Sequence, residues 1–255
     1  MDILEPFHRI NEKPLDHLVT DGGYARIFRT IGCIGDSLSS GEFQTINERG
    51  ENVYRDYYEY SWGQYLARMT GATVYNLSRG GMTAKEYMEQ FAEENGLFRM
   101  KYAAQAYIVA LGVNDLLNQD QPIGSMEDVF PANPSENADT FAGNLGRIVS
   151  SYRKIEPRSV FFFMTMPKYD RPDDLQRKMN AHADLMYQMA ECFGNAYVLD
   201  LRQYAPVYDS HFKDLFYLNG HMSPAGYLFT AQMVASYLDY IVRSDMAAFK
   251  EIGLV

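Results

Sequence analysis

The stretch Ile31-Gly32-Cys33-Ile34-Gly35-Asp36-Ser37-Leu38 determines how the rest of this chain is interpreted. Its apolar part carries no charge and ends in Gly-Asp-Ser, and the polar residues 39–42 follow at once. A short apolar run bounded by turn residues is typical of a strand buried in a parallel sheet. Open α/β sheets bind their ligands at the carboxyl ends of such strands. The pattern therefore predicts a strand that delivers Ser37 to a ligand-binding edge, where its hydroxyl can act as a nucleophile.

Apolar segments alternate with amphipathic ones along the rest of the chain. Further strands are expected at residues 73–76, 106–111, 159–164 and 196–199. Helices are expected near residues 62–70, 82–94, 137–155 and 173–193, whereas 38–61 and 112–135 have no regular pattern. A last helix begins after Ser223, a good N-cap, because Pro224 suits the first helical position. Alternating strands and helices predict an α/β three-layer sandwich with a five-stranded parallel sheet in the flavodoxin-like order 2-1-3-4-5.

Length and composition fit one domain. The 255 residues are 47% hydrophobic and 22% charged, so we expect a single domain over 1–255 with residues 1–29 as a surface extension. The formal net charge of −10 argues against nucleic acid or an anionic membrane as a partner. No apolar run approaches the roughly 20 residues that span a bilayer. The N-terminus lacks the pattern of a signal peptide, which favours a cytoplasmic location unless an export signal has been removed.

Polar residues follow the predicted strand ends. Ser37 follows the first strand, Gly80 and Gly81 close the segment after the second, and Asn114 comes soon after the third. His221 stands just before the last helix. Because the carboxyl ends of parallel strands share one edge, we expect these groups to gather there. A hydroxyl, an imidazole, a backbone N–H and an amide are the groups that acyl transfer needs.

In the identity and order of these blocks the chain resembles the GDSL, or SGNH, hydrolases, from about residue 30 to residue 242. The resemblance implies that Ser37 attacks an ester carbonyl and that His221 accepts its proton. It also implies an oxyanion hole formed by the backbone N–H of Ser37, the backbone N–H of Gly81 and the side-chain amide of Asn114. We choose Gly81 over Gly80 because the family glycine usually lies five positions after the Asn that ends the second strand. The resemblance implies no metal and no organic cofactor.

One position departs from the family pattern. The family usually has an aspartate three residues before the histidine, where it orients the imidazole, and here that position is Leu218. A backbone carbonyl or another side chain can accept the ring N–H instead. Asp214 and Asn219 are near candidates in sequence, and Asp200 is a more distant one. We predict that Ser37 and His221 lie within hydrogen-bond reach, and His211 is the rival base.

These observations favour a serine esterase that removes a small acyl group such as acetate, through an acyl-enzyme intermediate, from a carbohydrate or other small ester. A thioesterase or lysophospholipase of the same fold is one alternative, and it requires an apolar acyl tunnel. A non-catalytic glycan-binding module is another. The aromatic run 54–65 is interpreted either as core or interface, or as a sugar-stacking surface. The sequence leaves the substrate and the oligomeric state open.

Overall fold

The computed structural model describes residues 11–252, and a five-stranded parallel sheet lies at its centre. In spatial order the strands are β4 (Thr73–Ser78), β1 (Thr30–Gly35), β5 (Ala106–Ala110), β6 (Val160–Met164) and β7 (Ala196–Leu199). All neighbouring pairs are parallel. Counted along the chain among these five strands, this is the order 2-1-3-4-5, so the predicted topology is confirmed.

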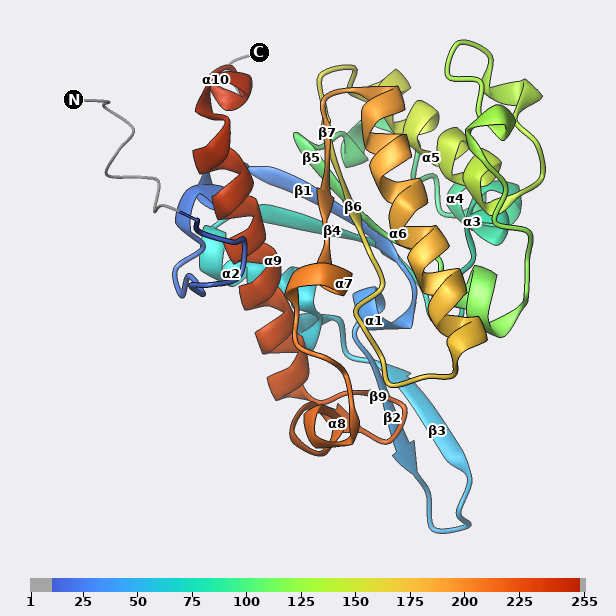
Figure 1. Ribbon diagram of the computed structural model, residues 1–255, viewed down its shortest axis with the longest axis vertical. Coiled ribbons are helices and arrows are strands. Elements are labelled where there is room, and N and C mark those ends of the chain that lie inside the picture. The colour runs from blue at the N-terminus through green and yellow to red at the C-terminus, as the bar shows by residue number, and fades with distance from the viewer. Residues whose placement is uncertain (1–10, 253–255) are drawn as a thin grey trace.

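Helices cover both faces of the sheet (Figure 1). One core lies beneath α2 (Trp62–Thr70), α9 (Pro224–Ser244) and α10 (Met246–Phe249). The other lies beneath α5 (Phe141–Ile155) and α6 (Asp173–Phe193). Strand residues alternate between the two cores: Phe162 packs into the first, and Phe161 and Phe163 pack into the second. The predicted three-layer α/β/α arrangement is confirmed.

Several helix limits follow from the caps in the sequence. Ser61 accepts a hydrogen bond from the Gln64 N–H at the start of α2, and Gly71 ends that helix in the left-handed region. Ser223 caps α9 by accepting from the Gly226 N–H. The predicted helix at 137–155 begins later, at Phe141, because Thr140 is its cap.

The predicted helix at 82–94 is interrupted. It consists of α3 (Ala84–Glu86), a π turn at Tyr87–Phe91 and α4 (Ala92–Glu94). The predicted loop 112–135 contains another π turn at Val113–Asn118 and 3₁₀ turns at Met126–Asp128 and Pro134–Glu136. Further 3₁₀ turns are at Gly23–Ile27, Tyr58–Tyr60 and Met100–Tyr102.

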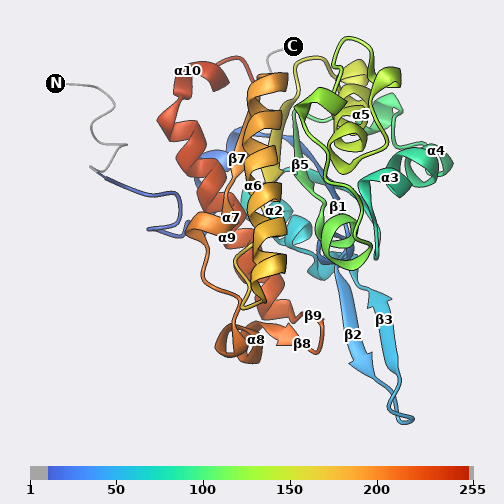
Figure 2. The same cartoon turned by 45° about the vertical axis from the view of Figure 1, so that its right-hand side comes forward.

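A β-hairpin that the sequence pattern did not predict projects from the body of the molecule (Figures 1 and 2). It consists of β2 (Glu42–Ile46) and β3 (Asn52–Asp56), which pair antiparallel. The hairpin begins right after α1 (Ser37–Ser40), the short helix at the end of β1. It therefore starts beside the Ser37 edge of the sheet.

Short elements also surround the C-terminal edge of the sheet. They are α7 (Leu201–Tyr204), α8 (Ser210–Phe216), β8 (Tyr217–Leu218) and β9 (His221–Met222). The last two form a small antiparallel hairpin that carries His221. Figure 2 shows α8, β8 and β9 at the same end of the molecule as the base of the β2–β3 hairpin.

Residues 11–29 lie against α9. The Val19 N–H donates to Ser236 Oγ, the Tyr24 N–H donates to an Asp239 carboxyl oxygen, and Phe28 is fully buried. Residues 1–10 of the predicted surface extension lie outside the described part of the chain. Between residues 11 and 252, no helix has the length and apolar character that crossing a membrane requires.

Candidate active site

Ser37 lies where β1 passes into α1, at the edge of the sheet. Asp36 is the N-cap of that helix, and its Oδ1 accepts a hydrogen bond of 3.1 Å from the Leu38 N–H. Burial raises the pKa of the Asp36 carboxyl to about 6, although the backbone hydrogen bonds oppose that shift. A Cβ on Gly35 would lie 2.2 Å from Ser39 Oγ, so this turn requires glycine. Ser37 is partly exposed, and the Asp36 cap and the Gly35 turn determine the backbone conformation next to it.

A pocket of about 530 Å³ opens beside Ser37. Its lining includes Gly81, Asn114 and His221, so the structure brings together all four blocks that the sequence singled out. They come from β1, the segment after β4, the segment after β5 and β9, which are far apart in the chain. This volume suits a small organic ligand.

Asn114 is fixed with its Nδ2 toward the start of α1. Its Oδ1 accepts from Asn118 Nδ2 at 2.8 Å, so Nδ2 is the end that meets Asp36 and Met82. That nitrogen lies 3.2 Å from the Met82 carbonyl oxygen and 3.5 Å from Asp36 Oδ2. Gly81 is exposed and has φ +71°. No atom lies within 4 Å of the point where a side-chain Cβ would be placed on this residue. Both groups face space that a ligand can enter.

His221 is held by the β2–β3 hairpin. Its Nε2 lies 3.0 Å from Glu42 Oε1, and its Nδ1 lies 3.2 Å from Gln44 Oε1. The Tyr54 ring lies edge-on to the imidazole with centroids 5.8 Å apart. Glu42 and Gln44 are two residues apart on β2 and therefore point to the same side of that strand. The hairpin thus contacts His221 through three side chains.

The contact with Gln44 determines which nitrogen of His221 carries a hydrogen. Gln44 Oε1 already accepts a hydrogen bond of 3.0 Å from the Gly220 N–H, which identifies that atom as the oxygen. An oxygen at 3.2 Å from Nδ1 requires a hydrogen on Nδ1. In the neutral ring Nε2 is then the unprotonated nitrogen, as a general base for a serine requires.

The Glu42 carboxyl lies against that second nitrogen. Two lone pairs at 3.0 Å would repel, so one proton is shared between Glu42 Oε1 and His221 Nε2. Burial raises the pKa of Glu42, with the charge of Asp56 adding to the effect. Burial lowers the pKa of His221, and Asp56 opposes that shift. The two shifts bring the proton affinities of the partners closer together, which favours sharing.

Gly80 provides the space for this carboxyl. A Cβ on Gly80 would lie 2.3 Å from Glu42 Oε2, which is closer than any side chain tolerates. Tyr227 adds a second restraint, because its hydroxyl donates a hydrogen bond of 2.6 Å to the Glu42 backbone oxygen. The position of Glu42 is therefore set by packing on two sides.

In the described part of the chain, His221 forms no hydrogen bond with Ser37 or Asp214, the partners expected from the sequence. Among residues 11–252, no hydrogen bond joins Ser37 to His221, whose Nε2 is occupied by Glu42. Asp214 is exposed on α8 and forms no hydrogen bond or ion pair with His221, whose two ring nitrogens meet Glu42 and Gln44. No backbone carbonyl takes the Nδ1 hydrogen either, since Gln44 does.

The other residues considered for this role are also placed elsewhere. Asp200 caps α7 and accepts from Thr165 Oγ1. Asn219 donates to the Gln44 backbone oxygen instead of meeting the ring. His211, the rival base, is exposed and does not line the pocket.

Sequence reasoning missed Glu42 and Gln44. The one indication in the sequence is that Glu42 and Gln44 occupy alternate positions directly after the nucleophile segment, as residues on one face of a strand do. The core interpretation of the aromatic run 54–65 is confirmed only for Trp62, and the sugar-stacking interpretation stays a prediction. Tyr54 contacts His221, whereas Trp62 is buried in the core.

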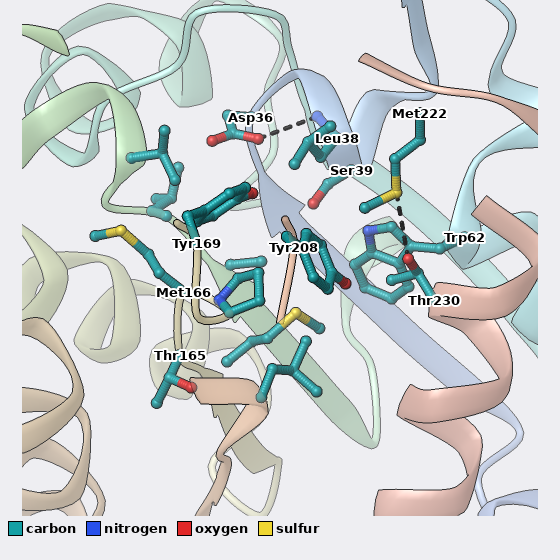
Figure 3. Close-up of a pocket in the computed structure, with 16 residues that line it drawn as sticks. Asp36, Leu38, Ser39, Trp62, Thr165, Met166, Tyr169, Tyr208, Met222 and Thr230 are labelled. Carbon is teal, nitrogen blue, oxygen red and sulfur yellow. Dashed lines mark hydrogen bonds between the residues drawn. The ribbon is translucent and has the colours of Figure 1, made fainter. Parts of the chain in front are cut away.

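An apolar chamber adjoins the Ser37 pocket, and Figure 3 shows the residues that line this chamber. Its volume is about 60 Å³, and it shares Asp36, Leu38, Val113 and Tyr169 with the outer pocket. Tyr208 and Trp62 also line it and are labelled in Figure 3. The chamber is large enough for only a few heavy atoms.

Residues 11–252 contain no group of three or more His, Cys, Asp or Glu side chains arranged to hold a metal ion. His182 is fully buried, and its Nε2 lies 3.0 Å from the Leu111 carbonyl oxygen. It is a packing residue of the core under α6. His8 lies outside the described residues.

Comparison with known proteins points to one family. A model of the GDSL-like lipase/acylhydrolase family matches residues 33–228. A search of curated proteins found no match.

Solved structures share the fold. The chain is similar to a carbohydrate esterase family 2 enzyme with a carbohydrate-binding domain from Corynascus thermopiles (Myceliophthora fergusii). The TM-score is 0.55 and the identity 17%, over 87% of this chain and 67% of that one. A lipolytic protein of the G-D-S-L family from Desulfitobacterium hafniense gives a TM-score of 0.52 at 16% identity, over 82% and 99% of the two chains. The psychrotrophic esterase EstA from Pseudoalteromonas sp. gives 0.53 at 15% identity, over 84% and 98%.

Proposed function

This chain belongs to the GDSL-like lipase/acylhydrolase family, and on that premise we propose that it is a serine esterase that removes a small acyl group, such as acetate, from a carbohydrate ester. One observation carries the proposal. Ser37, Gly81, Asn114 and His221 line a single pocket although they come from four separate parts of the chain. Together they supply a nucleophile, a base and oxyanion donors.

In the proposed reaction Ser37 Oγ attacks the ester carbonyl while His221 Nε2 takes its proton. The developing oxyanion accepts hydrogen bonds from the Ser37 and Gly81 backbone N–H groups and from Asn114 Nδ2. The protonated ring then gives its proton to the leaving alcohol, and an acyl-enzyme remains on Ser37. Water, activated by His221 Nε2, hydrolyses that ester and restores the enzyme.

Gln44 and Glu42 have different parts in this scheme. Gln44 keeps the hydrogen on Nδ1 throughout, in the place where the family usually has an aspartate. Its amide carries no charge, so it stabilises the imidazolium less than a carboxylate does. Glu42 must release Nε2 before Ser37 can use it. A substrate that binds next to Ser37 would displace Glu42, because Glu42 lines the same pocket.

The preference for a small acyl group rests on the two cavities. The outer pocket has polar and charged walls, and the adjoining apolar chamber is only about 60 Å³. A long acyl chain needs a much larger apolar tunnel, so a lysophospholipase or long-chain thioesterase fits less well. The preference for a carbohydrate is supported by the polar walls and by the carbohydrate esterase named among the similar structures.

The test is an activity panel on the purified protein. It compares acetylated sugars, 4-nitrophenyl acetate, 4-nitrophenyl octanoate and acyl-CoA esters, with Ser37→Ala as the control. We expect turnover of the acetate esters only, and none with the variant. Preference for octanoate or acyl-CoA would contradict the proposal. Inertness toward every ester, together with sugar binding, would indicate a glycan-binding protein.

A covalent probe tests the nucleophile independently of substrate choice. A phosphonate ester that reacts with activated serines should add to the protein once. Peptide mass spectrometry should locate the adduct on Ser37. Labelling of another serine, or none, would contradict the assigned nucleophile.

A further inference from the structure

Two cationic side chains converge on one wall of the Ser37 pocket. Arg171 comes from the segment before α6, and Lys213 comes from α8. The Arg171 guanidinium carbon lies 6.0 Å from the centroid of the Tyr169 ring, and Lys213 Nζ lies 5.9 Å from the same centroid. Cation–π contacts to one ring hold both charges beside the pocket.

Neither cation is neutralised within the described chain. Among residues 11–252, no carboxylate lies within 4.0 Å of the Arg171 guanidinium or of Lys213 Nζ, and neither group donates a hydrogen bond. The two carboxylates that line the pocket have other partners. Asp36 caps α1, and Glu42 contacts His221.

The acidic residues nearest in sequence do not pair with these cations either. Asp209 accepts from the Phe212 N–H as the cap of α8. Asp170, Asp173, Asp174 and Asp214 are exposed, and none of them forms an ion pair with Arg171 or Lys213. In a chain of net charge −10, two cations left free beside the nucleophile indicate complementarity to an anion.

We propose that the substrate carries an anionic group, a carboxylate or a phosphate, which Arg171 and Lys213 bind while its ester reaches Ser37. This inference rests on the proposed function and narrows its substrate class to acylated acidic sugars or sugar phosphates. Arg171 offers a planar fork of donors, and Lys213 adds a point charge. Because the anion is distant from the reacting bond, it lowers KM more than it raises kcat.

The kinetic test uses substrates that differ only in charge. 4-Methylumbelliferyl 2,3,4-tri-O-acetylglucuronide, which bears a free carboxylate, is compared with its neutral primary amide, which carries the same three acetates, and acetylated glucose 6-phosphate forms a third arm. We expect kcat/KM for an anionic substrate to exceed that for the neutral one by about tenfold or more at low salt. The double variant Arg171→Gln with Lys213→Gln should lose that preference, because neither side chain then offers a positive charge to the anion.

A matched control variant loses the same number of positive charges at positions outside the pocket. Lys168→Gln with Arg177→Gln removes two positive charges from exposed side chains that do not line this pocket. That control should keep the preference for anionic substrates. Equal kcat/KM for charged and neutral substrates in the unmodified protein, or loss of preference in the control as well, would overturn the inference.

Measurements of ligand binding test the anion site independently of the proposed esterase activity. Titration calorimetry on the Ser37→Ala protein compares the deacetylated glucuronide, glucose 6-phosphate and the neutral deacetylated amide. Tighter binding of either anion, abolished by the Arg171 and Lys213 substitutions, supports the anion site even if the protein hydrolyses no ester. Equal binding of all three overturns the anion site even if 4-nitrophenyl acetate is hydrolysed.

Discussion

Glu42 Oε1 lies 3.0 Å from Nε2 of His221, on the nitrogen that the proposed reaction needs for Ser37. Gln44 already requires the ring hydrogen on Nδ1, so a proton must lie between Glu42 and Nε2. The pocket therefore holds its base in a protonated pair with a carboxyl group. Loss of that proton, or movement of Glu42, makes the base available.

Replacement of Glu42 by Gln should move the acid limb of the kcat/KM profile to lower pH. A carboxylate beside Nε2 favours the imidazolium form, so its removal lowers the pKa of His221 further than burial alone. The ring acts as base only when Nε2 is unprotonated, and a lower pKa keeps it unprotonated in more acidic solution. Steady-state kinetics between pH 4 and 9 measure the limb. Glu51→Gln, an exposed change in the same hairpin region, is the control.

Gly80→Ala tests the same contact from the other side. The new Cβ would lie 2.3 Å from Glu42 Oε2 and should displace the carboxyl without removing it from the protein. We expect a shift of the acid limb in the same direction as with Glu42→Gln. A limb that stays fixed in both variants would show that Glu42 does not govern the protonation of His221.

Asp214→Asn should leave kcat within about twofold of the unmodified protein. Asp214 is exposed on α8 and forms no hydrogen bond or ion pair with His221, so its charge contributes little to the ring. Loss of a true triad acid costs about 10³–10⁴ in kcat. A loss of that size would show that α8 rearranges when substrate binds.

The fold was predictable because buried parallel strands have a clear signature in the sequence. The segments that form β5 and β6 are short and wholly apolar, and the helices between strands carry standard caps such as Ser223. The β2–β3 hairpin was not predictable in this way. Most of its residues are exposed, and polar and buried side chains alternate only over Glu42–Gln44, which is too short a stretch to predict a strand.

The site was predictable where motif and strand end coincide, as at Ser37 and Asn114. The residue that orients the His221 ring, Gln44, was not predictable, because it lies 177 residues from His221 in the chain. Leu218 shows that the usual aspartate is missing, yet nothing local indicates what replaces it. Only the folded arrangement brings β2 beside β9 and thereby identifies Gln44.

Asn114→Ala should lower kcat by about 10²–10³, as removal of one preorganised oxyanion donor does. The matched variant Asn118→Ala removes only the side chain that donates to Asn114 Oδ1, so its loss should be much smaller. Kinetics with 4-nitrophenyl acetate and a thermal unfolding midpoint for each variant make the comparison. Turnover near that of the unmodified protein in Asn114→Ala would make Asn114 a structural residue.

Gly112→Ala should destabilise the fold by about 2–4 kcal/mol. Gly112 has φ +131°, and a Cβ there would lie 2.6 Å from Nε2 of the buried His182. Gly194→Ala is the matched control, since Gly194 has φ +57° with no atom within 4 Å and should cost only about 1–2 kcal/mol. Urea denaturation of the two variants measures the difference. Equal costs would show that the core around His182 accommodates the methyl group.

Gln44 should prove necessary because it fixes the tautomer of His221. Gln44→Ala removes the acceptor for the Nδ1 hydrogen, and we expect kcat to fall about 10²-fold, less than for loss of a charged triad acid. Gln44→Glu keeps an acceptor for both Gly220 and His221 and adds a negative charge. That charge favours the imidazolium, so the acid limb should move to higher pH while turnover on the alkaline side is retained. Thr45→Ala, an exposed change on the same strand, controls for disturbance of the hairpin. If Gln44→Ala keeps full activity, a group other than Gln44 orients the ring during catalysis.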